Sequence, residues 1–245
     1  EIGKRFGIMP SFMAKWSQDY PGCSGHIHQS LSDGKRNLFH DAQSPRAMSR
    51  VFESYLAGQV ACLMEFGPML WPTINSYKRL VDGFWAPVKP TWGIDNRTAS
   101  FRVLAGSPKA TRLETRCPGS DVNPYLAMAA VIAAGMHGVE KGLKLTAPPI
   151  PGTNEGAENV PRAPRSLIET TRNFKGSEVA RDAPAMRAGR VRTRLAPPRG
   201  GVRRTHGRSQ SGCRGKISRC VCARVNPEGR DSRRGRYSPP ASAVR

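Results

Sequence analysis

The sequence predicts an α+β domain in residues 1–182, followed by a disordered tail in residues 183–245. Short segments that alternate between polar and apolar residues indicate strands. Two longer segments carry apolar residues at helical spacing. Beyond residue 182 the composition becomes rich in Arg, Gly, Ser and Pro, with no Phe or Trp. Because such a segment cannot bury enough apolar surface to offset its ordering entropy, only the first part is expected to form a core.

The first predicted strands lie in residues 6–16, which a proline interrupts, and in residues 24–31. Successive side chains of a strand point to opposite faces, so His26, His28 and Ser30 share one face. Two imidazoles on one face can supply a metal ligand and a hydrogen-bond donor to an anion. A strand histidine is also often a structural residue, and these positions alone leave both interpretations open.

Two further strands are predicted at residues 100–105 and 111–117. The second places Arg112, Glu114 and Arg116 on one face. A carboxylate between two guanidiniums can ligate a hard cation, while the planar Arg groups hold phosphate or carboxylate oxygens in pairs. The alternative is an ion-pair ladder on a solvated face.

Helical spacing predicts a helix from Pro45 to about residue 67 and another from Pro124 to about Leu143. Proline suits the first turn of a helix, where its missing N–H costs no hydrogen bond. Residues 71–97 are punctuated by Pro, Gly and Trp and are interpreted as a long irregular binding loop or lid. A loop at 148–164 and helical pieces at 166–174 and 177–182 complete the domain.

The net charge of +21 would ordinarily suggest a nucleic-acid or membrane partner. Residues 183–245 carry 17 Lys and Arg against 2 Asp and Glu, so most of the excess belongs to the tail. The six cysteines form no CxxC pair, and no apolar run approaches the ~20 residues that a membrane helix needs. We therefore expect a reduced, cytoplasmic protein without a membrane partner.

A series of basic residues runs through the irregular region and its neighbours. A general basic surface would explain them, but Arg102 lies among apolar strand residues, where a guanidinium needs an anionic partner. Together they suggest an anionic, phosphate-bearing ligand with a divalent cation. The series comprises Lys78, Arg79, Arg97, Arg102, Lys109, Arg112 and Arg116.

Several motifs in order resemble the C-terminal catalytic domain of glutamine synthetase. They are GHIHQSL, PTINSYKRLVDG, NRTAS followed by FRV, and SPKATRLETRCPGSDVNPYLAMAA. The resemblance extends from about residue 5 to residue 182. It implies an antiparallel half-barrel sheet with packed helices, in an ATP-dependent ligase of glutamine biosynthesis and nitrogen metabolism. In this family the glutamate γ-carboxylate is phosphorylated, and ammonia then displaces phosphate, with Mg²⁺ or Mn²⁺ as cofactor.

The resemblance also implies roles for individual residues. His26 and Glu114 resemble metal ligands, and Gly22, Arg79 and Arg116 resemble residues that bind glutamate. His28, Ser30, Arg102 and Lys109 resemble ATP-binding residues. Arg97 resembles a catalytic arginine that serves ATP and the transferred phosphate, and Arg112 resembles a further catalytic arginine of the active site.

The sequence departs from the family pattern at the flap, where Trp85 stands in place of the glutamate that helps to deprotonate ammonium. An indole cannot accept that proton, and its bulk suits an organic amine. The resemblance therefore leaves open a γ-glutamyl-polyamine or other γ-glutamyl-amine ligase.

The N-terminal domain and most metal-binding glutamates of the family would precede Glu1, so we interpret the chain as a fragment. Such a fragment is expected to be inactive alone, with impaired metal binding and doubtful assembly into the family's stacked homo-oligomeric rings. A non-catalytic fragment or pseudo-enzyme is the alternative from another class.

For residues 183–245 the favoured hypothesis is a reading-frame shift near residues 181–183. The alternatives are a basic arm that binds nucleic acid incidentally, and a zinc site from His206, Cys213, Cys220 and Cys222, whose spacing fits no common zinc module.

Overall fold

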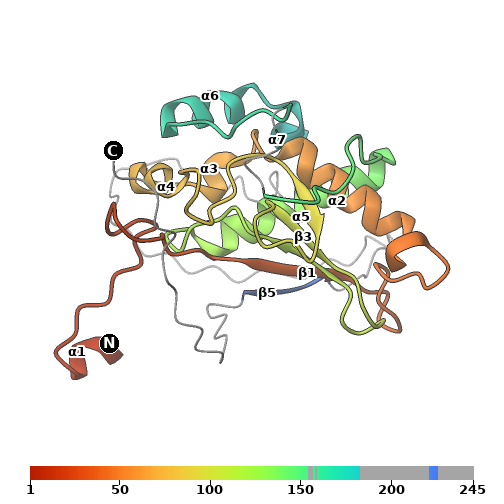
Figure 1. Cartoon of the computed structure of the whole chain (residues 1–245), viewed down its shortest axis with the longest axis horizontal. Coiled ribbons are helices and arrows are strands. Elements are labelled where there is room, and N and C mark those ends of the chain that lie inside the picture. Colours follow the sequence, from red (N-terminus) through yellow and green to blue (C-terminus); the bar gives the residue numbers. More distant parts are fainter. Residues whose placement is uncertain (154–156, 158, 183–220, 226–245) are drawn as a thin grey trace, which may run out of the picture.

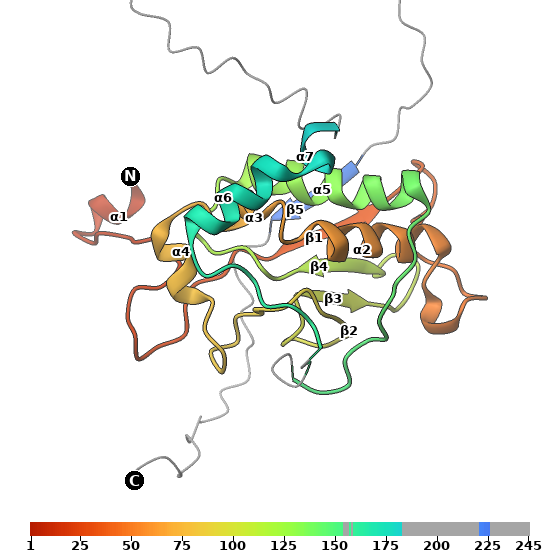
Figure 2. The same ribbon diagram turned by 90° about the horizontal axis from the view of Figure 1, so that it is seen from above.

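The computed structural model describes residues 1–153, 157, 159–182 and 221–225, the last as backbone only. These residues form a five-stranded sheet in the order β2-β3-β4-β1-β5, with helices packed on one face (Figures 1 and 2). All neighbouring strands are antiparallel except β2 and β3, which are parallel. The α+β class is confirmed, but the sheet is mixed at its β2 edge. The strands are β1 (Ile27–Leu31), β2 (Trp92–Ile94), β3 (Phe101–Leu104), β4 (Arg112–Thr115) and β5 (Val221–Val225).

The helices differ in length and in their place in the fold. Two long helices, α2 and α5, lie across the sheet, and the others are short or lie at its margins (Figure 2). No helix in the described residues is long and apolar enough to cross a membrane. The helical elements are α1 (Ile2–Arg5), the 3-10 turn η1 (Pro45–Ala47), α2 (Arg50–Cys62), α3 (Gly67–Leu70), α4 (Ile74–Arg79), α5 (Pro124–Lys141), α6 (Leu167–Gly176) and α7 (Glu178–Asp182).

Helix α5 confirms its prediction closely. The side chain of Asn123 caps its first turn by accepting hydrogen bonds from the backbone N–H groups of Tyr125 and Leu126. Gly142 ends it in the left-handed conformation, with φ of 60°. The helix predicted from Pro45 starts later, at Arg50, because Pro45 opens only a 3-10 turn and the following chain is extended up to the N-cap.

Two other predictions need correction. Residues 6–16 form no strand and carry exposed apolar side chains, including those of Met9 and Phe12. The region 71–97 is less irregular than expected, because it contains α4 and β2. Helix α4 forms where Thr73 and Ser76 make a reciprocal capping box, in which each side chain bonds the other residue's backbone N–H.

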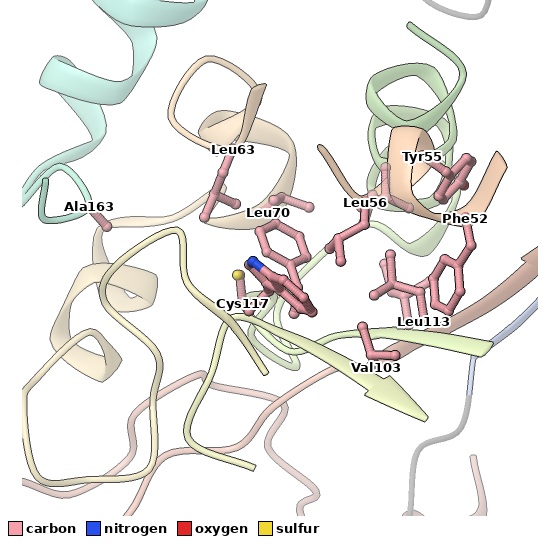
Figure 3. Close-up of a cluster of buried hydrophobic side chains, with 14 of the residues drawn as sticks. Phe52, Tyr55, Leu56, Leu63, Leu70, Val103, Leu113, Cys117 and Ala163 are labelled. Carbon is pink, nitrogen blue, oxygen red and sulfur yellow. The ribbon is translucent and has the colours of Figure 1, made fainter. Parts of the chain in front are cut away.

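The hydrophobic core lies between the sheet and the pair α2 and α5. Figure 3 shows Phe52 and Leu56 of α2 pointing toward Val103 and Leu113 of the sheet, while the ring of Tyr55 lies beside α5. All five are fully buried. The apolar side chains of the alternating strands therefore face the helices, and the polar side chains of the same strands are left on the opposite face.

Helices α2 and α5 approach each other closely at a pair of glycines. A Cβ atom on Gly58 would lie 2.2 Å from the Ala134 carbonyl oxygen, and one on Gly138 would lie 2.0 Å from the Ser54 carbonyl oxygen. Both positions thus exclude any side chain. The contact brings the two helices together as one layer over the sheet.

A buried polar network links the helix layer to two strands. Gln29 of β1 donates to Thr115 Oγ1 of β4 over 2.8 Å and accepts from Tyr55 Oη over 2.8 Å. Gln59 donates to Gln29 Oε1 over 2.7 Å and to the Val131 carbonyl over 2.9 Å, and it accepts from Thr115 Oγ1. Because its members satisfy one another, the network favours one strand register.

Of residues 183–245, which are predicted to be disordered, the structure describes only residues 221–225, and these form a strand. Val221–Val225 form β5, which pairs antiparallel with β1 at the sheet edge. The predicted frame shift, basic arm and zinc site rest mainly on residues outside the described ones and stay hypotheses, although Cys222 of the zinc site falls in β5.

Replacing Gly138 by alanine should destabilise the fold by about 3 kcal/mol, although alanine normally favours a helix. The added methyl group would collide with the Ser54 carbonyl oxygen. The matched control is Gly176→Ala, where nothing lies within 4 Å of the added atom. Urea denaturation of both variants measures the effect, and equal stability of the two would contradict the packing argument.

Candidate active site

Polar side chains of three neighbouring strands form a row on the face of the sheet that the helices leave uncovered. Glu114 of β4 lies opposite His28 of β1 and opposite Arg102 of β3 in the strand registers. His26 and Arg116 extend the row beside them. The predicted sharing of a face by Arg112, Glu114 and Arg116, and by the two histidines, is consistent with this placement.

Glu114 is the centre of this cluster. Its Oε2 accepts from Arg102 Nη1 over 2.8 Å, and its Oε1 accepts from Arg116 Nη1 over 2.7 Å. His26 Nδ1 lies 3.0 Å and His28 Nε2 lies 3.9 Å from the same Oε1. The carboxylate is only 2% exposed, so its charge is balanced by side chains and not by water.

The surroundings shift the pKa of each central group. Burial raises the pKa of Glu114, but the hydrogen bond from His26 and the charges of Arg116 and Arg102 outweigh it and hold the pKa well below its ordinary value. Burial lowers the pKa of His26 and of His28, which the carboxylate only partly opposes. At neutral pH the site therefore combines an ionised carboxylate with neutral imidazoles and charged guanidiniums.

Arg112 lies at the edge of the cluster. Its Nε donates to His28 Nδ1 over 3.2 Å, and its Nη1 donates to the Ala110 carbonyl over 2.9 Å. The bond to His28 ties the orientation of that ring to β4. Ser30 follows on the same face of β1 and is half-buried.

Arg79 and Gly22 meet below the row. The guanidinium of Arg79 is buried and donates to the carbonyls of Cys117, over 2.9 Å, and Arg116, over 3.3 Å. Burial lowers its pKa to about 10. A Cβ on Gly22 would lie 2.2 Å from the Ala14 carbonyl oxygen and 2.9 Å from Arg79 Cγ, so only glycine fits there. Arg79 therefore supports the backbone at Arg116, and the missing side chain of Gly22 leaves room for Arg79.

Asp95 belongs to the cluster, although sequence reasoning did not single it out. Its Oδ1 accepts two hydrogen bonds from Arg102, from Nε over 2.9 Å and from Nη2. These bonds and that to Glu114 outweigh burial and raise the pKa of Arg102. The sequence did indicate that Arg102, a strand arginine among apolar residues, needs an anionic partner. It did not indicate which acidic residue would be that partner.

Arg97 and Trp85 lie in a cleft of about 760 Å³ next to the cluster. Asp95 connects the two, because it lines the cleft and also bonds Arg102. The Trp85 side chain is 60% exposed, and its φ of 60° is unusual for a residue other than glycine. Lys109 lies exposed in the loop between β3 and β4, and the structure brings it into neither the cluster nor the cleft.

The described residues do not by themselves fit a divalent metal. His26 and Glu114 can supply two donors, but no group of three or more ligating side chains comes together in the described part of the chain. Magnesium requires an octahedral set of oxygen donors, which two side chains do not define. We therefore assign no chemical step to a metal here.

A protein-family model matches most of this chain. The model of the glutamine synthetase catalytic domain matches residues 1–188. The chain belongs to the glutamine synthetase family. The match ends at residue 188, whereas the predicted domain boundary lies at residue 182.

Curated relatives include glutamine synthetases and a ligase that is named for an organic amine. Type-1 glutamine synthetase 2 of Dictyostelium discoideum is 52% identical over 188 residues, covering 74% of this chain and 36% of the relative. Glutamate–isopropylamine ligase of a Pseudomonas species is 40% identical and covers 74% of this chain and 40% of the relative. The chain thus spans well under half the length of these relatives.

Solved structures agree with the family assignment. The GmaS/ADP complex matches with a TM-score of 0.66 and 29% identity, covering 76% of this chain and 44% of that chain. GmaS without ligand matches with the same score. The likeness therefore extends over most of this chain but less than half of each solved chain.

Replacing Glu114 by glutamine should destabilise the protein by roughly 3 kcal/mol, because it removes the carboxylate that the buried Arg116 and the partly buried Arg102 share. The control is Asp33→Asn, which alters an exposed pair with Arg36 and should change stability little. Denaturant unfolding measures both. Similar losses in the two variants would show that Glu114 does not balance the site.

Proposed function

We propose that this chain supplies part of the active site of an ATP-dependent glutamate ligase. The reaction forms a γ-glutamyl amide from glutamate and ammonia through γ-glutamyl phosphate. One observation carries the proposal: the cationic cluster around Glu114 is joined, through Asp95, to the cleft that contains Arg97. The chain also belongs to the glutamine synthetase family. Phosphoryl transfer depends mainly on positioning and on charge stabilisation, which such a cluster supplies.

The proposed roles follow the placement of the side chains. Arg116 binds a glutamate carboxylate, and its buried Nε, which has no hydrogen-bond partner in the described residues, is a donor for that purpose. Arg79 contributes by holding the backbone at Arg116, and Gly22 contributes by leaving room for the Arg79 side chain. Arg97 and Arg112 serve the transferred phosphoryl group from the cleft and from the sheet face.

The remaining predicted residues are assigned to ATP. His28 and Ser30 lie on the open face of β1, and Arg102 is oriented by Asp95. Lys109 would reach the nucleotide from its exposed loop. The family's dependence on Mg²⁺ or Mn²⁺ is proposed for the whole protein, as are assembly into homo-oligomeric rings and a cytoplasmic location.

Trp85 favours an organic amine as a second candidate acceptor. The exposed indole lines the cleft with Ile94, which gives the entrance an apolar side. An indole cannot take a proton from ammonium, whereas it can pack against the carbon skeleton of an amine. Relatives of this chain include a glutamate–isopropylamine ligase and a γ-glutamylethanolamide synthetase.

The test is phosphate release from ATP in the presence of glutamate, Mg²⁺ and either ammonia or an amine. It would be run on this chain and on a chimaera that joins the N-terminal part of the Dictyostelium relative to it. We expect release that Arg97→Gln and Arg112→Gln each lower by roughly 100-fold or more. Titration with Mg-ATP measures nucleotide binding, which a ligase should show and a non-catalytic protein should not. The absence of both turnover and nucleotide binding would refute the proposal.

The acceptor is tested by Trp85→Glu in whichever form turns over. Restoring a carboxylate should shift the ratio of kcat/KM values toward ammonia and away from ethanolamine by roughly tenfold or more. Trp16→Glu is the matched control, because it changes an exposed tryptophan outside the cleft. An unchanged ratio of kcat/KM values in Trp85→Glu would show that Trp85 does not determine which acceptor the enzyme uses.

A further inference from the structure

A second groove lies away from the cluster and is not used by the proposed reaction. It has a volume of about 780 Å³ and runs between the start of α2 and the segment 143–149 that follows α5. In Figure 2 this segment, which we call the strap, descends from the end of α5 past the ends of the strands toward β2. The groove therefore borders β2 on the side of the helix layer.

Three cations from separate segments line the groove. Arg46 comes from the turn η1, Arg50 from the first position of α2 and Lys144 from the strap. All three are exposed, and in the described part of the chain none of them forms an ion pair. Glu53 is the one acidic side chain in the lining. The formal charge around the groove is therefore +2.

The backbone at one wall is held in an unfavourable conformation. Arg46 has φ of 63° and Ala47 has φ of 51°, a region that residues with a side chain rarely occupy. Two such residues in succession cost free energy, and strain of this kind concentrates at ligand sites. The conformation places the Arg46 guanidinium 6.0 Å from the centre of the Trp92 ring, at the groove.

The opposite wall is preformed. Trp92 Nε1 donates to the Ala147 carbonyl over 2.9 Å, and the backbone N–H of Ile150 donates to the Trp92 carbonyl over 2.9 Å. Trp92 itself is only 3% exposed, so the half-buried Leu143 and Leu145 supply the apolar surface of this wall. The groove thus combines an apolar wall with cations that are already in place, which lowers the ordering cost of binding.

We propose that this groove binds a phosphomonoester with a compact apolar body. A phosphomonoester carries a charge of about −1.5 to −2 at neutral pH, which complements the charge of the groove. Arginine forks bind phosphate oxygens in pairs, and the positive end of α2 adds to the attraction. The apolar body packs on Leu143 and Leu145 of the strap, so the site differs from the catalytic face both in place and in lining.

The test uses phenyl phosphate as the probe, with inorganic phosphate and phenol as comparison compounds. Binding is followed by titration calorimetry and by the NMR signal of the Trp92 indole N–H, assigned with Trp92→Phe. We expect phenyl phosphate to bind more tightly than either comparison compound and to shift that signal. Arg46→Gln and Lys144→Gln should each weaken binding roughly tenfold, as expected for loss of a charged hydrogen bond.

Two variants serve as controls. Arg172→Gln removes an exposed charge on α6, outside the groove, and Arg97→Gln removes one from the predicted catalytic cleft. Neither should change the affinity. No binding, binding equal to that of inorganic phosphate, or binding lost only in Arg97→Gln would each overturn the proposal. Because the readout is binding, its failure is distinct from a failure of the ligase activity.

Discussion

The structure of the site depends on one buried carboxylate. Glu114 is bonded by Arg102 and Arg116 on either side and approached by His26, all within 3.0 Å. Without a negative charge at this point the guanidiniums would repel one another on a surface that water barely reaches. The same carboxylate keeps the arginines of β3 and of the end of β4 oriented, so the cationic face exists before any substrate binds.

The opposite side of the sheet makes this arrangement possible. Gln29 lies next to His28 on β1, and Thr115 lies next to Glu114 on β4, but their side chains point into the core. A one-residue slip of either strand would bury the charged residues and expose the network. The polar network in the core therefore determines the register that places the site residues opposite each other, and the close contact of α2 and α5 covers it.

Local patterns in the sequence were sufficient for much of the fold. Alternation predicted the central strands and the shared face of Arg112, Glu114 and Arg116, because side-chain direction in a strand depends only on position. Helix α5 was predicted at both ends from Pro124 and its apolar run. The resemblance of several motifs to one family predicted which charged residues belong to a site, and the family match confirmed that the chain belongs to that family.

By itself, then, the sequence determined the strands and helices that have a periodic pattern of apolar residues. It also determined which types of residue the candidate site contains. Only the tertiary structure decided which residues meet: Asp95 with Arg102, Gly22 with Arg79, and Arg97 in a cleft beside the cluster. It also showed that β2 is parallel to β3. These features depend on strand pairing and on contacts between segments far apart in the chain. A local pattern does not encode such contacts, because many pairings would satisfy the same alternation.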